Sequence, residues 1–310
     1  MYRVTTVGNY NLVLSNIMQA QRAQIAAGDK VSTQRNGSNL KEFARDAEIL
    51  TAMRSVNTRL NGYLEQNKMI ADKLTTQDFA LTQLGDAAAA AKQAIEEAIA
   101  TGRTDTLMQE MEAQFRIGVA AMNSQYSGKY LFAGGKIDTK PVTADDLTDL
   151  TDPLNPAVSD FFQNDSFVTE HKVDDATTVK TGLLANNLGT DMLEAFKAMQ
   201  AFHEGADGPF TGTLTDDQRA FLESQLAVWD SVASDVIDVT ARNGMMQARV
   251  DDVKTDLTSR QNSLKGMIGD IVDADMPRAT VELEKATLAL EASSQVFITL
   301  RDSSLLNVLK

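Results

Sequence analysis

The feature that most constrains the fold is a regular apolar series that starts after Phe43 and runs to about Ala100 without a proline. Its members are spaced alternately by four and three residues, which keeps one face of an α-helix against a partner helix, as in a coiled coil. A helix of this length measures about 87 Å, so we expect an elongated rod rather than a compact globule. The series is Ile49, Met53, Val56, Leu60, Tyr63, Asn67, Ile70, Leu74, Gln77, Leu81, Leu84, Ala88, Ala91, Ile95 and Ala98.

A second series with the same spacing runs from Trp229 to Ile271, with Asn243 and Arg260 as its polar members. A shorter helix is expected from Asp105 to about Tyr126, with apolar residues at Leu107, Met111, Phe115, Val119 and Met122. Three or four long helices can pack as a bundle, so the fold class is predicted to be mainly α. The spacing places Trp229 in the core. Asn67 and Asn243 either fix the register of the helices or lie at solvated positions near a helix bend.

The composition excludes several classes of partner and chemistry. With 29 Lys and Arg against 43 Asp and Glu, the net charge of −14 repels nucleic acid and anionic membrane surfaces at long range. The chain has no cysteine, so it forms no disulfide and no thiolate metal site. The amino end has no apolar run long enough for a signal peptide or a membrane span, so we expect any export to use no cleaved signal.

The centre of the chain loses the helical period. Residues 130–133 read as a short strand that enters a tight turn at Gly134 and Gly135. Residues 136–186 hold three of the five prolines and many Thr, Val and Asp residues, which indicates a β-rich outer insertion that is separable from the helices. Helix is expected again from Asp191 to Gly205, and Thr215 offers a cap for the last long helix. The predicted domains are terminal helices (1–40 and 272–310), a helical rod domain (41–135 and 187–271) and the insertion (136–186).

The two ends of the chain carry apolar residues at seam spacing, so they can pair with each other. The carboxy-terminal helix has a second apolar set, Val281, Leu288, Ala292 and Val296. A helix with two apolar faces needs cover from a larger globule or from other subunits, and we favour other subunits. The predicted subunit interface consists of Leu14, Ile17, Met18, Ile25, Leu283, Leu290, Phe297, Leu300, Leu305 and Leu306.

No pattern in the chain predicts catalysis. The acidic run at Asp145, Asp146, Asp149 and Asp152 lacks the glycine and final glutamate of an EF-hand loop. Each of the two histidines, His171 and His203, lacks the second histidine that a zinc protease motif needs. We therefore assign no catalytic, cofactor-binding or metal-binding residue and expect a protein that is not an enzyme.

Three stretches resemble a known family. Residues 25–31 (IAAGDKV) are similar to the amino-terminal "I-S-S-G-K-R-V" stretch of the bacterial flagellin superfamily. Residues 243–250 (NGMMQARV) and 271–295 resemble the motifs of its carboxy-terminal helical region. The chain departs from the family at residues 34–39 (QRNGSN), where flagellins carry an "S-D-D-P-A-G" type of stretch, although Asn-Gly still indicates a turn.

Two further stretches resemble the hook-associated members of the superfamily rather than the filament flagellin: residues 127–134 (SGKYLFAG) and 304–309 (SLLNVL). The resemblance implies a structural subunit that joins hook to filament and assembles through its terminal helices. It also implies a ring of identical subunits, a second hook-associated protein on the hook side, flagellin or an adaptor on the filament side, and an export chaperone. The expected location is extracellular, in the flagellum, with no cofactor. The alternatives are a filament flagellin or a secreted coiled-coil translocator.

Overall fold

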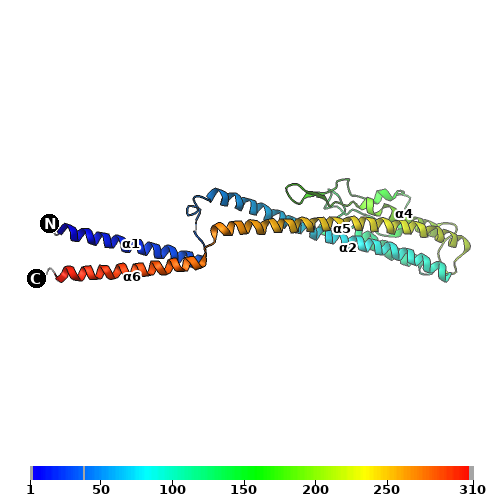
Figure 1. The fold of residues 1–310 in the computed structure, drawn as a ribbon. Coiled ribbons are helices and arrows are strands. Elements are labelled where there is room, and N and C mark those ends of the chain that lie inside the picture. Colours follow the sequence, from blue (N-terminus) through cyan, green and yellow to red (C-terminus); the bar gives the residue numbers. More distant parts are fainter. Residues whose placement is uncertain (1–2, 38, 307–310) are drawn as a thin grey trace. The chain divides into compact units, whose positions relative to one another are not determined.

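The computed structural model describes residues 3–37 and 39–306 and places most of them in helices (Figure 1). The predicted mainly α fold with a small β-containing insertion is therefore confirmed. The helices of this part of the chain are α1 (Arg3–Thr33), α2 (Ala47–Thr101), α3 (Leu107–Met122), α4 (Ala185–Glu204), α5 (Asp216–Val272) and α6 (Met276–Leu306). Between α3 and α4 lie the strands β1 (Gln125–Tyr126), β2 (Lys129–Tyr130), β3 (Glu170–Lys172) and β4 (Thr178–Lys180), and the short 3₁₀-helices η1 (Leu147–Thr151) and η2 (Val158–Phe161).

The chain forms two compact units. Residues 1–60 and 259–310 make up the terminal unit, and residues 61–258 make up the central unit. Both long helices, α2 and α5, contribute residues to each unit. The predicted domain boundaries fall at other residues and remain a prediction.

The core of the central unit lies between α2, α3, α4 and α5. The five predicted apolar residues of the short helix are all buried in α3. Phe196 of α4 packs edge-on against both Phe115 of α3 and Trp229 of α5, with ring centroids 5.5 Å and 4.7 Å away. Trp229 is thus a core residue, as its place in the second series predicts.

Glycines let α3 and α4 approach closely. A Cβ atom at Gly189 of α4 would lie 2.2 Å from Sδ of Met122, and one at Gly118 of α3 would lie 2.9 Å from Cε of Met192. Neither distance leaves room for a methyl group, so the two methionines fill the space that a side chain at either glycine would need.

The polar residues that interrupt the two series are buried and bind main-chain carbonyl groups. The Nδ2 atom of Asn67 donates a hydrogen bond to the carbonyl of Val173 (2.9 Å), and Nε2 of Gln77 donates to the carbonyl of Thr181 (3.1 Å). Asn243 of α5 instead donates to the carbonyl of Leu74 in α2 (3.0 Å). Asn243 therefore ties the two long helices together, whereas Asn67 and Gln77 hold the insertion against α2.

The first hairpin differs from its prediction. Strands β1 and β2 pair antiparallel, and Ser127 and Gly128 turn the chain with φ angles of 51° and 76°. The expected strand over residues 130–133 is wrong beyond Tyr130: Leu131 and Phe132 form a bend, and Ala133 makes only an isolated antiparallel bridge with Leu184. The turn expected at Gly134 and Gly135 is present, and the amide of Lys136 donates to the carbonyl of Ala133 (3.2 Å) to close it. Gly134 has a φ of 69°, and the amide of Gly135 donates to Oδ1 of Asp165 (2.8 Å), so this turn contacts a carboxylate of the insertion through Gly135.

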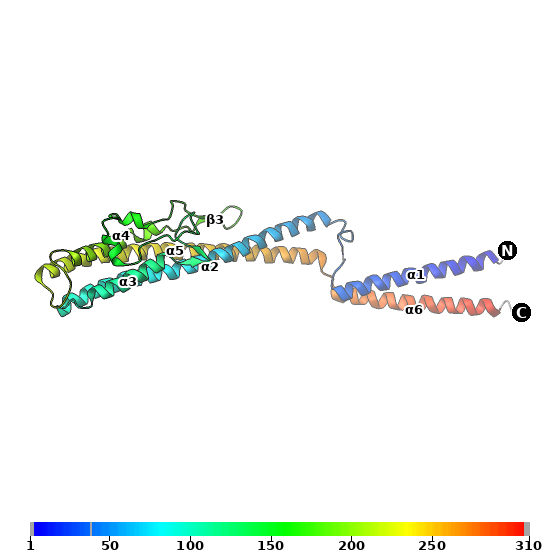
Figure 2. The same ribbon diagram turned by 180° about the vertical axis from the view of Figure 1, so that it is seen from behind.

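The insertion contains less strand than predicted and shares the core of the central unit. Its strands β3 and β4 form a pair of three residues each, with Glu170 opposite Lys180. Its buried apolar residues pack in the same cluster as α3 and α4; they are Val142, Ala144, Leu147, Leu150, Val158 and Phe161. Figure 2 shows this segment along one side of the helices of the central unit. The insertion is therefore not a separately packed module, contrary to the expectation.

In the terminal unit, the long helices use a different face from the predicted one. Leu50 is fully buried in α2, whereas the predicted Ile49 is 50% exposed. In α5, Gln261 is buried, whereas the predicted Met267 is exposed. An α-helix has 3.6 residues per turn, so its contact face drifts by about 20° per heptad against a strict 3.5-residue repeat. The drift moves the contact positions here by one residue.

Candidate functional site

The terminal helices α1 and α6 pack against each other in antiparallel orientation. Tyr10 of α1 meets Phe297 of α6 edge-on, with ring centroids 5.7 Å apart. Further along, Nε2 of Gln24 donates to Oγ1 of Thr287 (3.2 Å). The most buried apolar positions between the two helices are small or β-branched residues: Val13, Ala20, Ala27, Ala279 and Ala286. The predicted pairing of the two chain ends is confirmed. The contact between α1 and α6 buries mainly small side chains.

An ion pair stabilises the inner end of this helix pair. Nζ of Lys30 lies 3.1 Å from Oε2 of Glu282, and both side chains are partly exposed. The hydrogen bond from Lys30 and its positive charge lower the pKa of the Glu282 carboxyl, and Arg278 adds to the effect. The Glu282 carboxyl is therefore ionised at neutral pH, and the ion pair links α1 to α6 at this end.

Large apolar side chains remain exposed on both helices. A two-helix pair can hide only one face of each member, and here the other faces carry residues that would bury well. Leu288 is the most open of them, at 67% exposure. The exposed set is Leu12, Leu14, Met18 and Ile25 on α1 and Val281, Leu288, Val296 and Ile298 on α6. These residues form the two outer apolar faces of the terminal pair.

The predicted interface residues divide between the inner and outer faces. Leu14, Met18 and Ile25 are exposed, whereas Val13, Ala20 and Ala27 are the buried residues of α1. The assignment of the predicted residues to a subunit interface remains a prediction. Partly buried positions hold Ile17, Leu283, Leu290, Phe297 and Leu300. The side chains of Leu305 and Leu306 lie outside the described part of the chain.

Sequence reasoning missed Leu12 and Ile298. Both belong to the exposed apolar set of the terminal pair. Neither falls on the 3.5-residue series that was followed, because a helix with two apolar faces carries two overlapping series. The sequence does contain an indication of them: each terminal helix carries more large apolar residues than one helix-helix contact face can bury.

A short main-chain bridge closes the terminal pair at its inner end. The amide of Asn36 donates to the carbonyl of Val272 (2.8 Å), and the amide of Ala274 donates to the carbonyl of Gln34 (2.9 Å). The side chain of Asn36 donates from Nδ2 to the carbonyl of Asp273 (2.8 Å). The stretch that departs from flagellins therefore joins the end of α1 to the connection between α5 and α6.

The described residues contain no cluster of three or more His, Asp or Glu side chains arranged to hold a metal ion. Within the same part of the chain, no helix combines the length and the apolar character needed to cross a membrane. The candidate functional site is therefore the exposed apolar surface of α1 and α6.

Comparison with protein families identifies the class of protein that the carboxy-terminal part of the chain resembles. Residues 226–309 match the family model of the bacterial flagellin C-terminal helical region, so the resemblance to the flagellin superfamily is confirmed for this part of the chain. No curated protein sequence gives a significant match.

Solved structures then narrow the fold to that of hook-associated proteins. A candidate flagellar hook-associated protein of Vibrio parahaemolyticus superposes with a TM-score of 0.60 at 16% identity, covering 73% of this chain and 97% of its own. FlgL of Xanthomonas campestris gives 0.53 at 14% identity, with 70% and 98% covered. FlgL of Bacillus cereus gives 0.50 at 18% identity, with 66% and 98% covered. At these identities the similarity is one of fold.

Proposed function

We propose that the chain is a structural subunit of the bacterial flagellum that joins the hook to the filament. The observation that carries this proposal is the terminal pair, whose two outer apolar faces have no cover within the described part of the chain. The flagellin match over residues 226–309 and the fold of hook-associated proteins support it.

The terminal helices would supply the energy of assembly. Ordering the ends of a chain costs conformational entropy. Burial of apolar surface offsets this cost with a stabilising free energy of about 25 cal/mol per Å². Exposed Leu, Ile, Val and Met side chains on both α1 and α6 provide such surface on each subunit. Identical subunits would thus form a ring, with the terminal helices as its inner tube and the remaining helices and the insertion farther out.

The same proposal names the partners and the location. A second hook-associated protein would contact the ring on the hook side, and flagellin or an adaptor on the filament side. An export chaperone would cover the apolar ends before secretion without a cleaved signal, and the mature protein would be extracellular and without catalytic activity.

A filament flagellin is the second candidate, because the matched family model describes flagellin itself. Immunogold labelling of whole flagella separates the two. A hook-filament junction protein labels one narrow band at the base of the filament, whereas a flagellin labels the filament along its length.

Electron microscopy of cells that lack the protein tests the proposal. The expected result is bare hooks on the cells and unassembled flagellin in the medium. Cells that keep full-length filaments would refute a role in joining filament to hook.

A further inference from the structure

Three asparagines of the chain are followed directly by glycine, in the pairs Asn36-Gly37, Asn61-Gly62 and Asn243-Gly244. In such a pair the main-chain nitrogen of the glycine can attack the side-chain carbonyl carbon of the asparagine. Glycine favours this ring closure, because it has no Cβ atom to shield the nitrogen or to restrict the main chain. The structure places the three pairs in different surroundings, and these surroundings decide which pair reacts.

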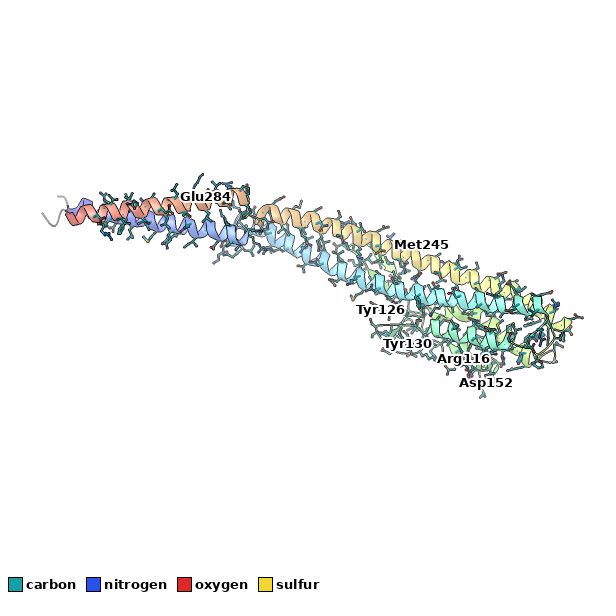
Figure 3. The ribbon with its side chains drawn as sticks, turned by 90° about the horizontal axis from the view of Figure 1, so that it is seen from below. Arg116, Tyr126, Tyr130, Asp152, Met245 and Glu284 are labelled. Carbon is teal, nitrogen blue, oxygen red and sulfur yellow. The ribbon has the colours of Figure 1, made fainter. Side chains whose placement is uncertain are left out.

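Two of the pairs lie inside long helices. Asn61 and Gly62 belong to α2, and Asn243 and Gly244 belong to α5. Figure 3 shows the ribbon of α5 unbroken at Met245, the residue that follows the pair in this helix. A helical amide donates to the carbonyl four residues earlier, and the fixed helical main chain does not let the nitrogen reach the side chain. These two pairs must therefore open locally before they react.

The remaining pair lies outside the helices, between α1 and α2. Asn36 is exposed, and it borders two hollows of the terminal unit, of about 400 and 600 Å³, that are large enough for water. Among the described residues, no acceptor receives a hydrogen bond from the amide of Gly37. The nitrogen that attacks is therefore free of a hydrogen bond, and water reaches the group that it attacks.

Packing requires a glycine at position 37. A Cβ atom there would lie 2.7 Å from both Cβ and Oε2 of Glu42, and 3.1 Å from Cε2 of Phe43. Any other residue would force these side chains to shift. The reactive pair is thus built into the connection between α1 and α2.

We propose that Asn36 is a site of spontaneous deamidation in the folded protein, and that the reaction loosens the bridge beside it. The nitrogen of Gly37 forms a bond to Cγ of Asn36, and the bond from Cγ to the side-chain nitrogen breaks. Ammonia leaves with the proton of the Gly37 amide, and a five-membered succinimide ring remains. Water then opens the ring at either carbonyl, which gives aspartate or isoaspartate at position 36. The whole reaction consumes one water molecule, releases one ammonia molecule and needs no other reactant.

The product weakens the bridge that joins the end of α1 to the connection between α5 and α6. Nδ2 of Asn36 donates to the carbonyl oxygens of Asp273 (2.8 Å) and Ile271 (3.4 Å). A carboxylate has no proton to donate, so it repels the same oxygens. Isoaspartate also adds a carbon to the main chain, for which the packing around Gly37 leaves no room. The adjoining hollow adds repulsion, because four acidic side chains and two basic ones line it: Asp270, Asp273, Asp275 and Glu282, with Lys30 and Arg278.

Peptide mapping by mass spectrometry tests the site, with the two helical pairs as internal controls. The purified protein is incubated at mildly alkaline pH, once folded and once unfolded in urea. In the folded sample, Asn36 should lose its amide roughly tenfold faster than Asn61 and Asn243, or more, because about 1.4 kcal/mol of local opening free energy lowers the reactive population tenfold. In urea all three should react at similar rates. Equal rates at the three sites of the folded protein, or reaction at Asn36 only in urea, would overturn the proposal.

The variant Asn36→Asp reproduces one product and tests its consequence. The main-chain amides of Asn36 and Ala274 donate across the bridge. In the variant, the amides at positions 36 and 274 should exchange hydrogen roughly tenfold faster, the effect of about 1.4 kcal/mol of lost local stability. The matched control Asn187→Asp makes the same change at an exposed position of α4 and should leave this exchange unaltered.

Incubated wild-type protein provides a second measurement of the consequence. Its bridge amides should exchange faster in proportion to the deamidated fraction. Unaltered exchange in both the Asn36→Asp variant and the deamidated protein would show that the reaction does not loosen the bridge. Neither measurement uses assembled flagella, so either result leaves the proposed function as it stands.

Discussion

Single amide side chains on α2 decide where the insertion packs. Asn67 and Gln77 stand in an otherwise apolar series, and each donates its only described hydrogen bond to a carbonyl of the insertion. A buried carbonyl that loses its donor keeps the cost of desolvation. Both residues were recognised from the sequence as interruptions, but the sequence does not reveal which distant carbonyl they bind.

Gln77→Ala should therefore lower the free energy of unfolding by about 1–3 kcal/mol, because the carbonyl of Thr181 loses its buried donor. The matched control is Gln93→Ala, at an exposed position of the same helix, which should change stability by less than about 0.5 kcal/mol. Urea denaturation followed by circular dichroism measures both. Equal effects of the two substitutions would show that the hydrogen bond contributes nothing.

His171 of β3 makes stability depend on pH. Burial lowers its pKa below the ordinary value of 6.5, and the positive charge of Lys73 on α2 lowers it further. As the pH falls through about 6.5, the unfolded chain binds a proton that the folded chain resists, so the free energy of unfolding decreases. The slope from this one group should be at most about 1.4 kcal/mol per pH unit.

Denaturation at a series of pH values checks this prediction. His171→Gln should remove the decrease contributed by this group, whereas His203→Gln, at the other histidine, should retain it. A decrease of the same size in the His171→Gln variant would mean that another group causes it.

At the scale of elements, the approach of α3 and α4 depends on glycine. Gly189 has Met122 within the space of a side chain, whereas Gly244 of α5 has open space around it. Gly189→Ala should destabilise the protein by about 1–3 kcal/mol through overpacking. Gly244→Ala should stabilise the isolated protein by up to about 1 kcal/mol through its helix propensity. Thermal denaturation of the two variants measures the difference, and a stabilising Gly189→Ala would show that the methionine moves aside at no cost.

The helices were predictable because their signals are local. The contacts of the insertion were not predictable, because they join residues that lie far apart in the sequence. The 3.5-residue series identified the buried face of α2 from Leu60 to Ala98, and it failed at Ile49 and Val56, where the contact face drifts. The turn at Ser127 and Gly128 was missed because the pair Gly134 and Gly135 gives the stronger local signal. The amide of Gly135 donates to Asp165, which lies 30 residues further along the chain, and no local pattern shows such a contact.

For the candidate site, the sequence indicated two apolar faces on the carboxy-terminal helix, and α6 carries them. It did not tell which apolar residues of α1 face inward. Leu14 and Met18 are exposed, whereas Val13 and Ala20 are buried. The smaller side chains allow α1 and α6 to approach each other more closely. Tertiary packing, not hydrophobicity, decides between them.

At the scale of the whole molecule, the two units differ in how well they are packed. The central unit buries large aromatic residues such as Phe115, Phe196 and Trp229, whereas the contact between α1 and α6 buries mainly alanines. Local stability follows the amount of buried apolar surface.

Hydrogen exchange of the purified protein, shown by light scattering to be a monomer, should therefore be far faster in α1 and α6 than in α3 and α4. Strong protection of the terminal helices in a monomer would contradict this, because it would mean that the pair is stable without neighbours.

The central claim is that the outer apolar faces of the terminal pair hold the subunit in the flagellum. Leu288→Asp tests it most directly, because this side chain is 67% exposed and a charge there leaves the contact between α1 and α6 intact. A carboxylate buried in a subunit interface without a partner costs several kcal/mol. The matched control is Phe79→Asp, which places the same charge at an equally exposed apolar position of the central unit. Electron microscopy should show bare hooks in the Leu288→Asp strain, with folded variant protein in the medium, and full filaments in the Phe79→Asp strain. Full filaments on the Leu288→Asp cells would contradict the account.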